Sequence, residues 1–365
     1  MKKPIQIIYA AAVMALMASC GDNTKCTVEG LVGDNSMDGK YVYLFDQADR
    51  STVKDSAMVR DGRYSFEFEV AEPWAAMLAS REGYAMQFVA EPGRVSVGAD
   101  SVGGTALNDR LMDYLRAYSA DDLEPELQTY LQAYYTAKDA AVRADAERRY
   151  DSIEAIALDR VVEASRSLYA EHPSDILGAM ALANMAEIDR LGFAELDSLM
   201  QHGSPIVSGY APLQKKLEQL RAIEATSAGH RYTDIQGVDG RLSDLIDGRV
   251  ALVDFYASWC GPCRAEIRDN LVPLWAKYQK KGLVIVGLNV WERGTAEQRE
   301  AAHQKVMADL GITYPQLVDS TRTATDTYGV NGIPQIMLIG ADGTILARDL
   351  RGAAIEEAVV KALGK

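Results

Sequence analysis

An apolar run that stops abruptly at a Cys-x-x-Cys sequence constrains this chain more than any other feature. Residues 252–264 read Leu-Val-Asp-Phe-Tyr-Ala-Ser-Trp-Cys-Gly-Pro-Cys-Arg, and residues 264–280 then follow a helical period. A thiol at the N-terminus of a helix faces unpaired backbone N–H groups and the positive end of the helix dipole, and both favour the thiolate. We therefore predict that Cys260 is a nucleophile and that Cys263, one turn later, is its resolving thiol.

Paired cysteines have two other common uses. A structural zinc ion needs four ligands, but the sequence has no second Cys-x-x-Cys and its four histidines are isolated, so we expect no metal. The second alternative is a peroxidatic cysteine, as in peroxiredoxins. That alternative is disfavoured because such a cysteine lacks a partner at this short spacing.

Two carboxylates near the cysteines are further candidates. Asp254 stands inside the apolar strand, where burial penalises the charged form and should raise the pKa. It is a candidate proton carrier, with a structural hydrogen bond as the alternative. Glu266 follows Cys263 by three residues and either influences the cysteine pair or lies in solvent.

Strands and helices alternate over residues 229–365, which predicts an α/β domain. Strands are expected at 249–257, 283–290, 335–340 and 344–348, and helices at 264–280, 296–310 and 353–363. This region resembles thioredoxin, and within it the TlpA/ResA-like branch, on Trp259 to Cys263, on Gly332-Ile333-Pro334 and on the final hairpin at 341–345.

The resemblance implies roles for single residues. Pro334 would follow a cis peptide bond opposite the redox pair, and the backbone of Ile333 would pair with the substrate chain, beside Trp259. Asp254 matches the buried proton-handling aspartate, and Glu266 a glutamate that tunes the pair.

The chain departs from the thioredoxin pattern at two positions. The lysine that partners the buried aspartate in thioredoxin falls at Gly287, so that ion pair is missing and the proton route relies on water or on Glu266. The active-site helix carries Pro273 instead of a proline nearer Cys263, which leaves the position of its kink open.

Two other parts precede this domain. Residues 20–104 alternate between apolar and polar and are interrupted by turn residues, which predicts an antiparallel β-sandwich. They resemble the DUF4369 family at segments 28–30, 43–44, 55–56, 61–66, 92–93 and 104–108. Residues 105–228 change to a helical period, and we expect the tyrosines on these apolar stripes, such as Tyr130, Tyr134 and Tyr150, to lie in a core. The fold class is thus multi-domain.

The N-terminus is typical of an export signal. Two lysines precede an apolar stretch that is too short to span a membrane comfortably, and residues 1–19 are predicted to be removed. The segment before Cys20 resembles a lipoprotein signal, so lipid on Cys20 would attach the protein to a membrane, on the periplasmic side of the cell envelope. Cys26 is interpreted as a small residue near a strand start.

The function predicted from these features is thiol-disulfide oxidoreduction on proteins, in the reducing direction. No flavin or nicotinamide fingerprint is present, so we expect no cofactor and require an upstream electron-donating thiol protein. The net charge of −14 argues against a nucleic-acid partner. Two alternatives stay open: an envelope-binding module with a redox-sensing pair, and a disulfide oxidase or isomerase.

Overall fold

A computed structural model describes residues 24–32, 35–238 and 240–364. By its contacts the chain divides into two compact units, Met1–Ala181 and Leu182–Lys365. The boundary falls within helix α4 (Ile176–Glu187), so the domain limits expected from the sequence stay a prediction. The predicted signal segment and Cys20 lie outside the described residues.

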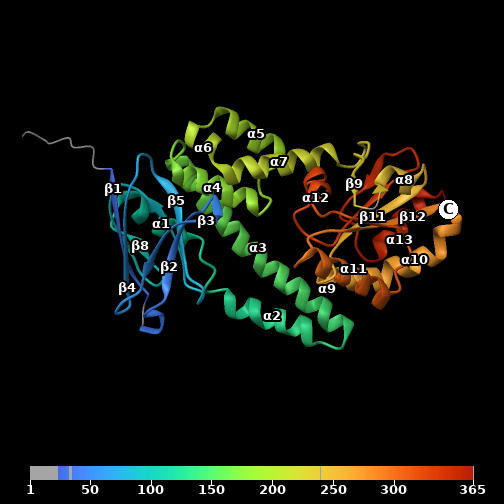
Figure 1. The fold of residues 1–365 in the computed structure, drawn as a ribbon, viewed down its shortest axis with the longest axis horizontal. Coiled ribbons are helices and arrows are strands. Elements are labelled where there is room, and N and C mark those ends of the chain that lie inside the picture. The colour runs from blue at the N-terminus through green and yellow to red at the C-terminus, as the bar shows by residue number, and fades with distance from the viewer. Residues whose placement is uncertain (1–23, 33–34, 239, 365) are drawn as a thin grey trace, which may run out of the picture. The chain divides into compact units, whose positions relative to one another are not determined.

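The first unit begins with two four-stranded sheets (Figure 1). Their strand orders are β4-β1-β7-β8 and β3-β2-β5-β6, and all pairs are antiparallel except β1 with β7. The elements are β1 (Lys25–Leu31), η1 (Asn35–Met37), β2 (Tyr41–Asp46), β3 (Asp49–Met58), β4 (Arg63–Glu69), β5 (Trp74–Ala79), β6 (Ala85–Ala90), β7 (Gly93–Val97) and β8 (Val102–Gly103). The alternation read from the sequence matches burial, since Tyr64 and Phe66 of β4 are buried between exposed neighbours. The expected N-terminal β architecture is confirmed.

A buried carboxylate joins these sheets to helix α1 (Ala106–Ala117). One oxygen of Glu91 accepts hydrogen bonds from the backbone N–H groups of Leu107 and Asn108 and from the Thr105 hydroxyl. The Asn108 side chain bonds to both the N–H and the C=O of Val89. The Thr-Ala-Leu-Asn segment therefore starts the helix and fixes it to the sheet edge, which is a structural role.

Helices α2 (Glu124–Thr136), α3 (Ala140–Glu171) and the first part of α4 complete the first unit. Tyr114 of α1 and Ser165 of α3 share a buried hydroxyl–hydroxyl hydrogen bond of 2.8 Å. The expectation that the tyrosine stripes are core residues holds only in part for α2, because Tyr130 and Tyr134 are half-buried and no residue of this helix is fully buried. The reason is that α2 packs mainly against one neighbour, α3, so its second face stays in solvent.

The second unit contains three further helices and the predicted α/β domain. The helices are α5 (Phe193–His202), α6 (Pro205–Gly209) and α7 (Ala211–Ala225). The α/β part contains β9 (Gln236–Gly237), β10 (Gly240–Arg241), α8 (Leu242–Ile246), β11 (Val250–Tyr256), α9 (Gly261–Glu266), η2 (Ile267–Leu271), α10 (Val272–Tyr278), η3 (Gln279–Lys281), β12 (Leu283–Asn289), α11 (Ala296–Leu310), β13 (Gln316–Val318), α12 (Thr323–Thr327), β14 (Gln335–Ile339), β15 (Ile345–Ala347) and α13 (Ala353–Ala362).

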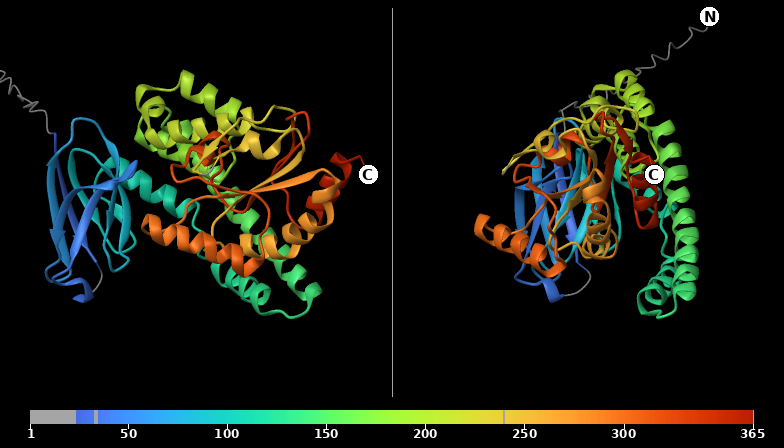
Figure 2. Two further views of the ribbon diagram at one scale, coloured as in Figure 1. Left: turned by 45° about the vertical axis from the view of Figure 1, so that its right-hand side comes forward. Right: turned by 90° about the vertical axis from the view of Figure 1, so that its right-hand side faces the viewer.

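Strand β11 lies at the centre of a five-stranded sheet of order β13-β12-β11-β14-β15. Its seven residues are all buried, as expected for a strand covered on both faces. The cluster on one face includes residues of α9, η2, α10, α11 and α13, and the cluster on the other face includes residues of α8 and α12. Figure 2 shows the sheet of this unit between its helices. The C-terminal end of β11, which the cysteines follow, therefore lies at the end of the sheet between two helical layers.

Pro273 determines the shape of the active-site helix. The turn immediately before it, Ile267–Leu271, is a π-helix, and the Val272 N–H bonds to the Ile267 carbonyl. Proline lacks an N–H and crowds the preceding turn, so a wider turn accommodates it without breaking the helix. The irregular turn thus begins four residues beyond Cys263, which answers the question that the sequence left open.

Helix α7 is attached to the α/β part by a partly buried arginine. The guanidinium of Arg348 donates to the Thr226 carbonyl at 3.2 Å and to the Tyr328 carbonyl at 2.8 Å. Gln219 of α7 also donates to the carbonyl of Gly329, whose backbone lies close to the helix. The last helix of the middle segment and the α/β domain therefore share one packed unit.

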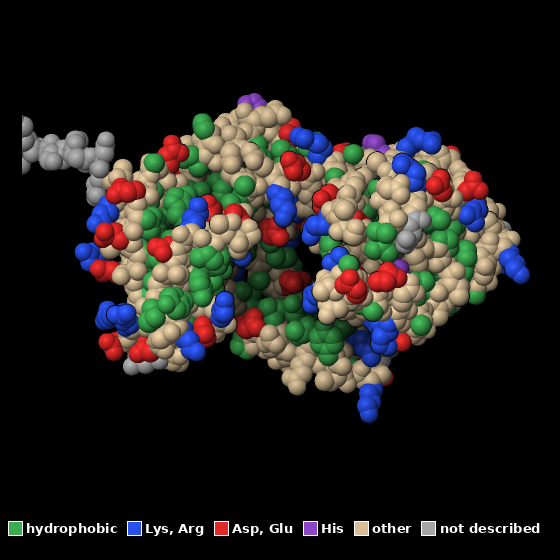
Figure 3. Space-filling model, viewed as in Figure 1, with side chains coloured by type: hydrophobic (Ala, Val, Ile, Leu, Met, Phe, Trp, Pro, Cys, Tyr) green, Lys and Arg blue, Asp and Glu red, His purple; other side chains and the backbone are tan. Residues whose placement is uncertain are grey.

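The charge distribution and the apolar character of the helices complete the description of the fold. Acidic and basic side chains are interspersed over the face in Figure 3. Among the described residues, no helix combines the length and the apolar character needed to cross a membrane.

Candidate active site

The two cysteines lie where β11 gives way to a helix. Cys260 is the N-cap residue of α9, and its Sγ accepts a hydrogen bond from the Cys263 N–H at 3.2 Å. The cysteines form a disulfide with a Cα–Cα distance of 5.3 Å. Cys260 keeps 4% of its surface exposed, whereas Cys263 is fully buried. The helix N-terminus favours a thiolate at Cys260, and the slight exposure gives an incoming sulfur access to that residue first.

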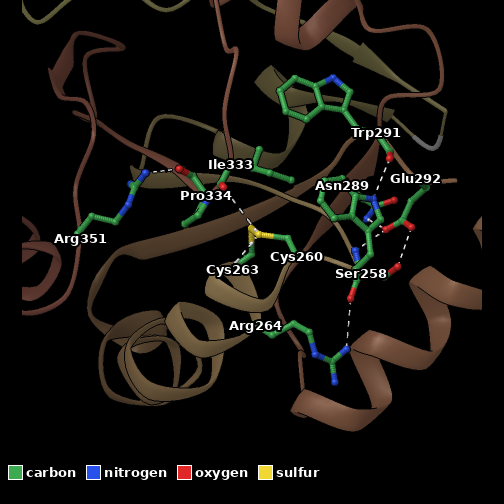
Figure 4. The surroundings of a disulfide bond; sticks show 11 residues. Ser258, Cys260, Cys263, Arg264, Asn289, Trp291, Glu292, Ile333, Pro334 and Arg351 are labelled. Carbon is green, nitrogen blue, oxygen red and sulfur yellow. Dashed lines mark hydrogen bonds between the residues drawn. A yellow bond between two sulfur atoms is a disulfide. The ribbon is translucent and has the colours of Figure 1, made fainter. Parts of the chain in front are cut away.

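A loop that ends in Pro334 covers the disulfide from the opposite side (Figure 4). The peptide bond between Ile333 and Pro334 is cis, as the resemblance implied. The Ile333 carbonyl oxygen lies 3.8 Å from Sγ of Cys260. Arg351 holds this loop by donating to the carbonyls of Pro334 and Leu350. The backbone of Ile333 is therefore next to the sulfur that a substrate would approach.

Trp259 forms an exposed apolar surface beside the cysteines. Its ring is anchored because the indole N–H donates to the Trp291 carbonyl at 2.9 Å, and the Arg293 guanidinium lies 4.2 Å from the ring centre. Even so, 43% of Trp259 is exposed. An anchored aromatic ring that remains in solvent can cover a bound chain with little loss of side-chain entropy.

Asp254 is buried on β11, with 1% of its surface exposed. Neither of its carboxylate oxygens has a hydrogen-bond partner among the described residues. Burial raises the pKa of Asp254 to about 8, the negative charge of Glu266 adds to the rise, and the positive charge of Arg351 opposes it. A carboxyl group with this pKa can both hold and release a proton near neutral pH.

Glu266 is half-buried at the end of α9. Its Oε1 accepts a hydrogen bond from the Asn270 side chain and one from the backbone N–H of Gly352, both at 2.8 Å. Glu266 therefore connects the active-site helix to the start of α13, a contact that neither sequence interpretation foresaw. Its influence on the cysteine pair stays a prediction.

Glu292 is a part of the site that the sequence did not indicate. Its carboxylate binds the backbone N–H and the hydroxyl of Ser258, and it also accepts from the Asn289 side chain at 2.8 Å. The loop before Trp259 is thus fixed to the end of β12, as Figure 4 shows. A single glutamate after an apolar strand carries no signal of such a contact, because its partner is 34 residues away.

The remaining candidates lie elsewhere. Cys26 is buried on β1, and burial raises the pKa of its thiol, which favours the unreactive protonated form. Within the part of the chain that the structure describes, no group of histidine, cysteine, aspartate or glutamate is arranged to hold a metal ion.

Known proteins share this site region. Residues 221–348 match the AhpC/TSA family, and residues 26–111 match a domain of unknown function, DUF4369. The chain is 32% identical over 163 residues to the thiol:disulfide interchange protein HelX of Rhodobacter capsulatus, covering 44% of this chain and 81% of that protein. It is 30% identical over 114 residues to the thiol-disulfide oxidoreductase ResA of Bacillus thuringiensis, covering 31% of this chain and 61% of that protein.

A solved structure can be added to these relatives. A thiol:disulfide interchange protein from Bacteroides sp. is 26% identical, with a TM-score of 0.34, and the match covers 39% of this chain and 93% of that one. The family matches confirm the two resemblances read from the sequence, the thioredoxin-like C-terminal part and the DUF4369-like N-terminal part.

Proposed function

Because this chain belongs to the family of thioredoxin-like thiol-disulfide oxidoreductases that includes HelX and ResA, we propose that it reduces protein disulfides outside the cytoplasm through Cys260 and Cys263. The supporting observation is a disulfide whose first sulfur sits at a helix N-terminus, 3.8 Å from the Ile333 carbonyl oxygen. That arrangement leaves one sulfur approachable and shields the other.

The reaction starts from the reduced pair. The Cys260 thiolate attacks one sulfur of the substrate disulfide, so the substrate S–S bond breaks, a mixed disulfide forms and one substrate thiolate leaves. Cys263 then attacks Sγ of Cys260, which releases the second substrate thiol and forms the Cys260–Cys263 disulfide. The substrate gains two electrons and the enzyme loses two. A dithiol protein upstream must return these electrons, because the reaction includes no other reductant.

Asp254 serves the second step in this proposal. Cys263 is buried and must lose its proton before it attacks, and the Asp254 carboxylate is the base that would take it. A pKa raised to about 8 suits this role, since the carboxyl group then gains and loses the proton over the working pH range. Glu266 would tune the exchange through its charge, which already contributes to the raised pKa of Asp254.

Protein substrates fit the surface around Cys260. The half-buried Ile333 offers backbone groups next to the reactive sulfur, and an extended chain can pair with such groups irrespective of its side chains. Trp259 would cover the bound chain from the other side. Specificity would then depend mainly on which disulfides are accessible.

The location is part of the proposal. An export signal at 1–19 and acyl chains on Cys20 would hold the catalytic domain on the periplasmic side of the cell envelope, as a membrane-anchored lipoprotein. Along the chain, the β-sheet and helical parts lie between Cys20 and the catalytic domain.

Two measurements test the direction of the reaction. The purified chain should reduce insulin with a chemical dithiol as donor, and the Cys260–Cys263 pair should have a potential near that of thioredoxin, about −270 mV. A value near that of the strong oxidant DsbA, about −120 mV, would favour the oxidase alternative. Failure to turn over insulin, together with redox-dependent binding of an envelope protein, would favour the sensing module.

A further inference from the structure

A row of three paired residues crosses the sheet behind the cysteines. Asp254 of β11 pairs with Gly287 of β12, and Gly287 pairs with Gln316 of β13. Directly paired residues on neighbouring strands point to the same face of a sheet. The missing side chain at Gly287 therefore leaves space on the face of Asp254, at the position where the thioredoxin lysine falls.

The side chain of Gln316 fills that space. A Cβ atom placed on Gly287 would lie 2.5 Å from both Nε2 and Oε1 of Gln316. The amide is held at both ends, because the Tyr256 hydroxyl donates to Oε1 at 2.7 Å and Nε2 donates to the Tyr314 carbonyl at 3.1 Å. Tyr256 follows Asp254 by two residues on the same strand, so it lies on the same face. An uncharged amide–phenol pair thus lies beside Asp254.

On this face of the sheet, the side chains of Tyr314 and Asp254 have polar atoms without a hydrogen-bond partner among the described residues. Tyr314 is 2% exposed, and its hydroxyl makes no hydrogen bond among the described residues. The same holds for both carboxylate oxygens of Asp254. Burial raises the pKa of Tyr314, and the charge of Asp254 adds to the rise, so the two groups share one electrostatic environment. Buried polar groups without a protein partner are usually bridged by internal water, because leaving them unpaired is costly.

We propose that Tyr314 is a positioning residue that holds one buried water at Asp254, beside the Gln316 amide, and that Asp254 exchanges through this water the proton that it takes from Cys263. The inference rests on the proposed function. In this step Cys263 S–H gives its proton to the carboxylate. The carboxylic acid later gives a proton to the water, which is hydrogen-bonded to the Tyr314 hydroxyl and releases a proton in turn to solvent water; no electrons move. Because β13 is an edge strand of the sheet, the row from Asp254 through Gly287 to Gln316 runs from the central strand to the edge of the sheet.

The Tyr314→Phe variant tests the proposal, since it removes one oxygen and keeps the ring. The pKa of Asp254 in the oxidised full chain is read from the ¹³C shift of its carboxyl group. Without the hydroxyl the water is no longer held, so the carboxylate loses the donor that this water supplies. The pKa of Asp254 should rise by at least half a unit, and insulin reduction should slow severalfold at pH 7 but little at pH 9. The matched control is Tyr278→Phe, a buried tyrosine of the same cluster whose hydroxyl bonds to Glu356, and it should leave both values unchanged.

If Tyr314→Phe does not fold, a second variant tests whether the space over Gly287 adjoins the Asp254 carboxylate. Gln316→Ala combined with Gly287→Lys places an ammonium group in the space that the amide fills, so the pKa of Asp254 should fall by at least one unit. A pKa of Asp254 that neither variant moves would overturn the inference. If Asp254→Asn slows insulin reduction while Tyr314→Phe leaves rate and pKa unchanged, only the inference fails. If the wild-type chain does not reduce insulin, the proposed function fails and the ¹³C measurement still decides the inference.

Discussion

Glu292 accepts two hydrogen bonds from Ser258, one from the backbone N–H at 2.5 Å and one from the hydroxyl at 2.7 Å. The two residues come from loops at the ends of β11 and β12, which are neighbouring parallel strands. Their contact fixes the segment that carries Trp259 and leads into Cys260. The position of the redox pair thus depends on a carboxylate outside the Cys-x-x-Cys sequence.

Removal of this carboxylate should loosen the site. In Glu292→Ala the Ser258 N–H and the Asn289 amide lose a charged acceptor, and hydrogen bonds to charged groups contribute about 1.5–3 kcal/mol each. We expect a loss of about 2 kcal/mol or more in the free energy of unfolding, measured by urea denaturation of the oxidised protein. Glu300→Ala is the control, because among the described residues the Glu300 carboxylate accepts a hydrogen bond only from Gln304 on its own helix. This substitution should change stability by less than about 0.5 kcal/mol.

The order of attack can be read from trapped intermediates. With Cys263→Ser the first exchange still occurs but nothing resolves it, so mixed disulfides with substrate proteins should accumulate through Cys260. Cys260→Ser should give none, and alkylation of the reduced wild type should be faster at Cys260 than at the buried Cys263. Mass spectrometry of envelope extracts identifies the linked cysteine. Adducts through Cys263 or Cys26 would contradict the assignment of Cys260 as the nucleophile.

Asp254→Asn should keep the fold and slow the exchange. The amide has the same shape as the carboxyl group but cannot carry the proton of Cys263. We expect insulin reduction to fall by about tenfold to a hundredfold near pH 7, and the difference to shrink as pH rises and solvent removes that proton. Equal rates of variant and wild type from pH 6 to 9 would mean that Asp254 has a structural role.

The same substitution should change how stability depends on pH. The pKa of Asp254 is raised to about 8 in the folded oxidised protein, against about 3.9 when unfolded. Between these values the folded state holds a proton that the unfolded state has lost, so this group makes stability fall as pH rises from about 4 to 8. Asp254→Asn removes that decline. Its melting temperature should exceed that of the wild type by a margin that grows up to pH 8 and is constant above it.

Attachment to membranes should depend on Cys20. If acyl chains on this residue are the anchor, Cys20→Ala should move the protein from the membrane fraction to the soluble fraction and leave its insulin reduction unchanged. Fractionation with immunodetection measures the distribution. Retention of the variant in membranes at the wild-type level would argue for another means of attachment.

The sequence alone determined the features that depend on neighbouring residues. The apolar strand ending at Cys260, the helix that follows it, the burial of Asp254 and the β-rich and helical parts ahead of this domain are all local patterns, and the structure agrees with them. Only the resemblance to thioredoxin, however, suggested that Pro334 lies opposite the cysteines, because 71 residues separate it from Cys263 along the chain.

Tertiary structure decided the contacts that join distant segments. Glu292 meets Ser258 and Gln316 fills the space over Gly287 because parallel strands bring their ends and their paired residues together. Glu266 meets Gly352 because the end of α9 lies beside the start of α13. It also decided that the tyrosines of α2 stay partly exposed, since a helical stripe is buried only where a neighbouring element covers it. Local periodicity specifies which face of an element is apolar. The packing of the whole unit determines which groups of other elements contact that face. A hydrogen bond between distant residues leaves no local pattern in the sequence.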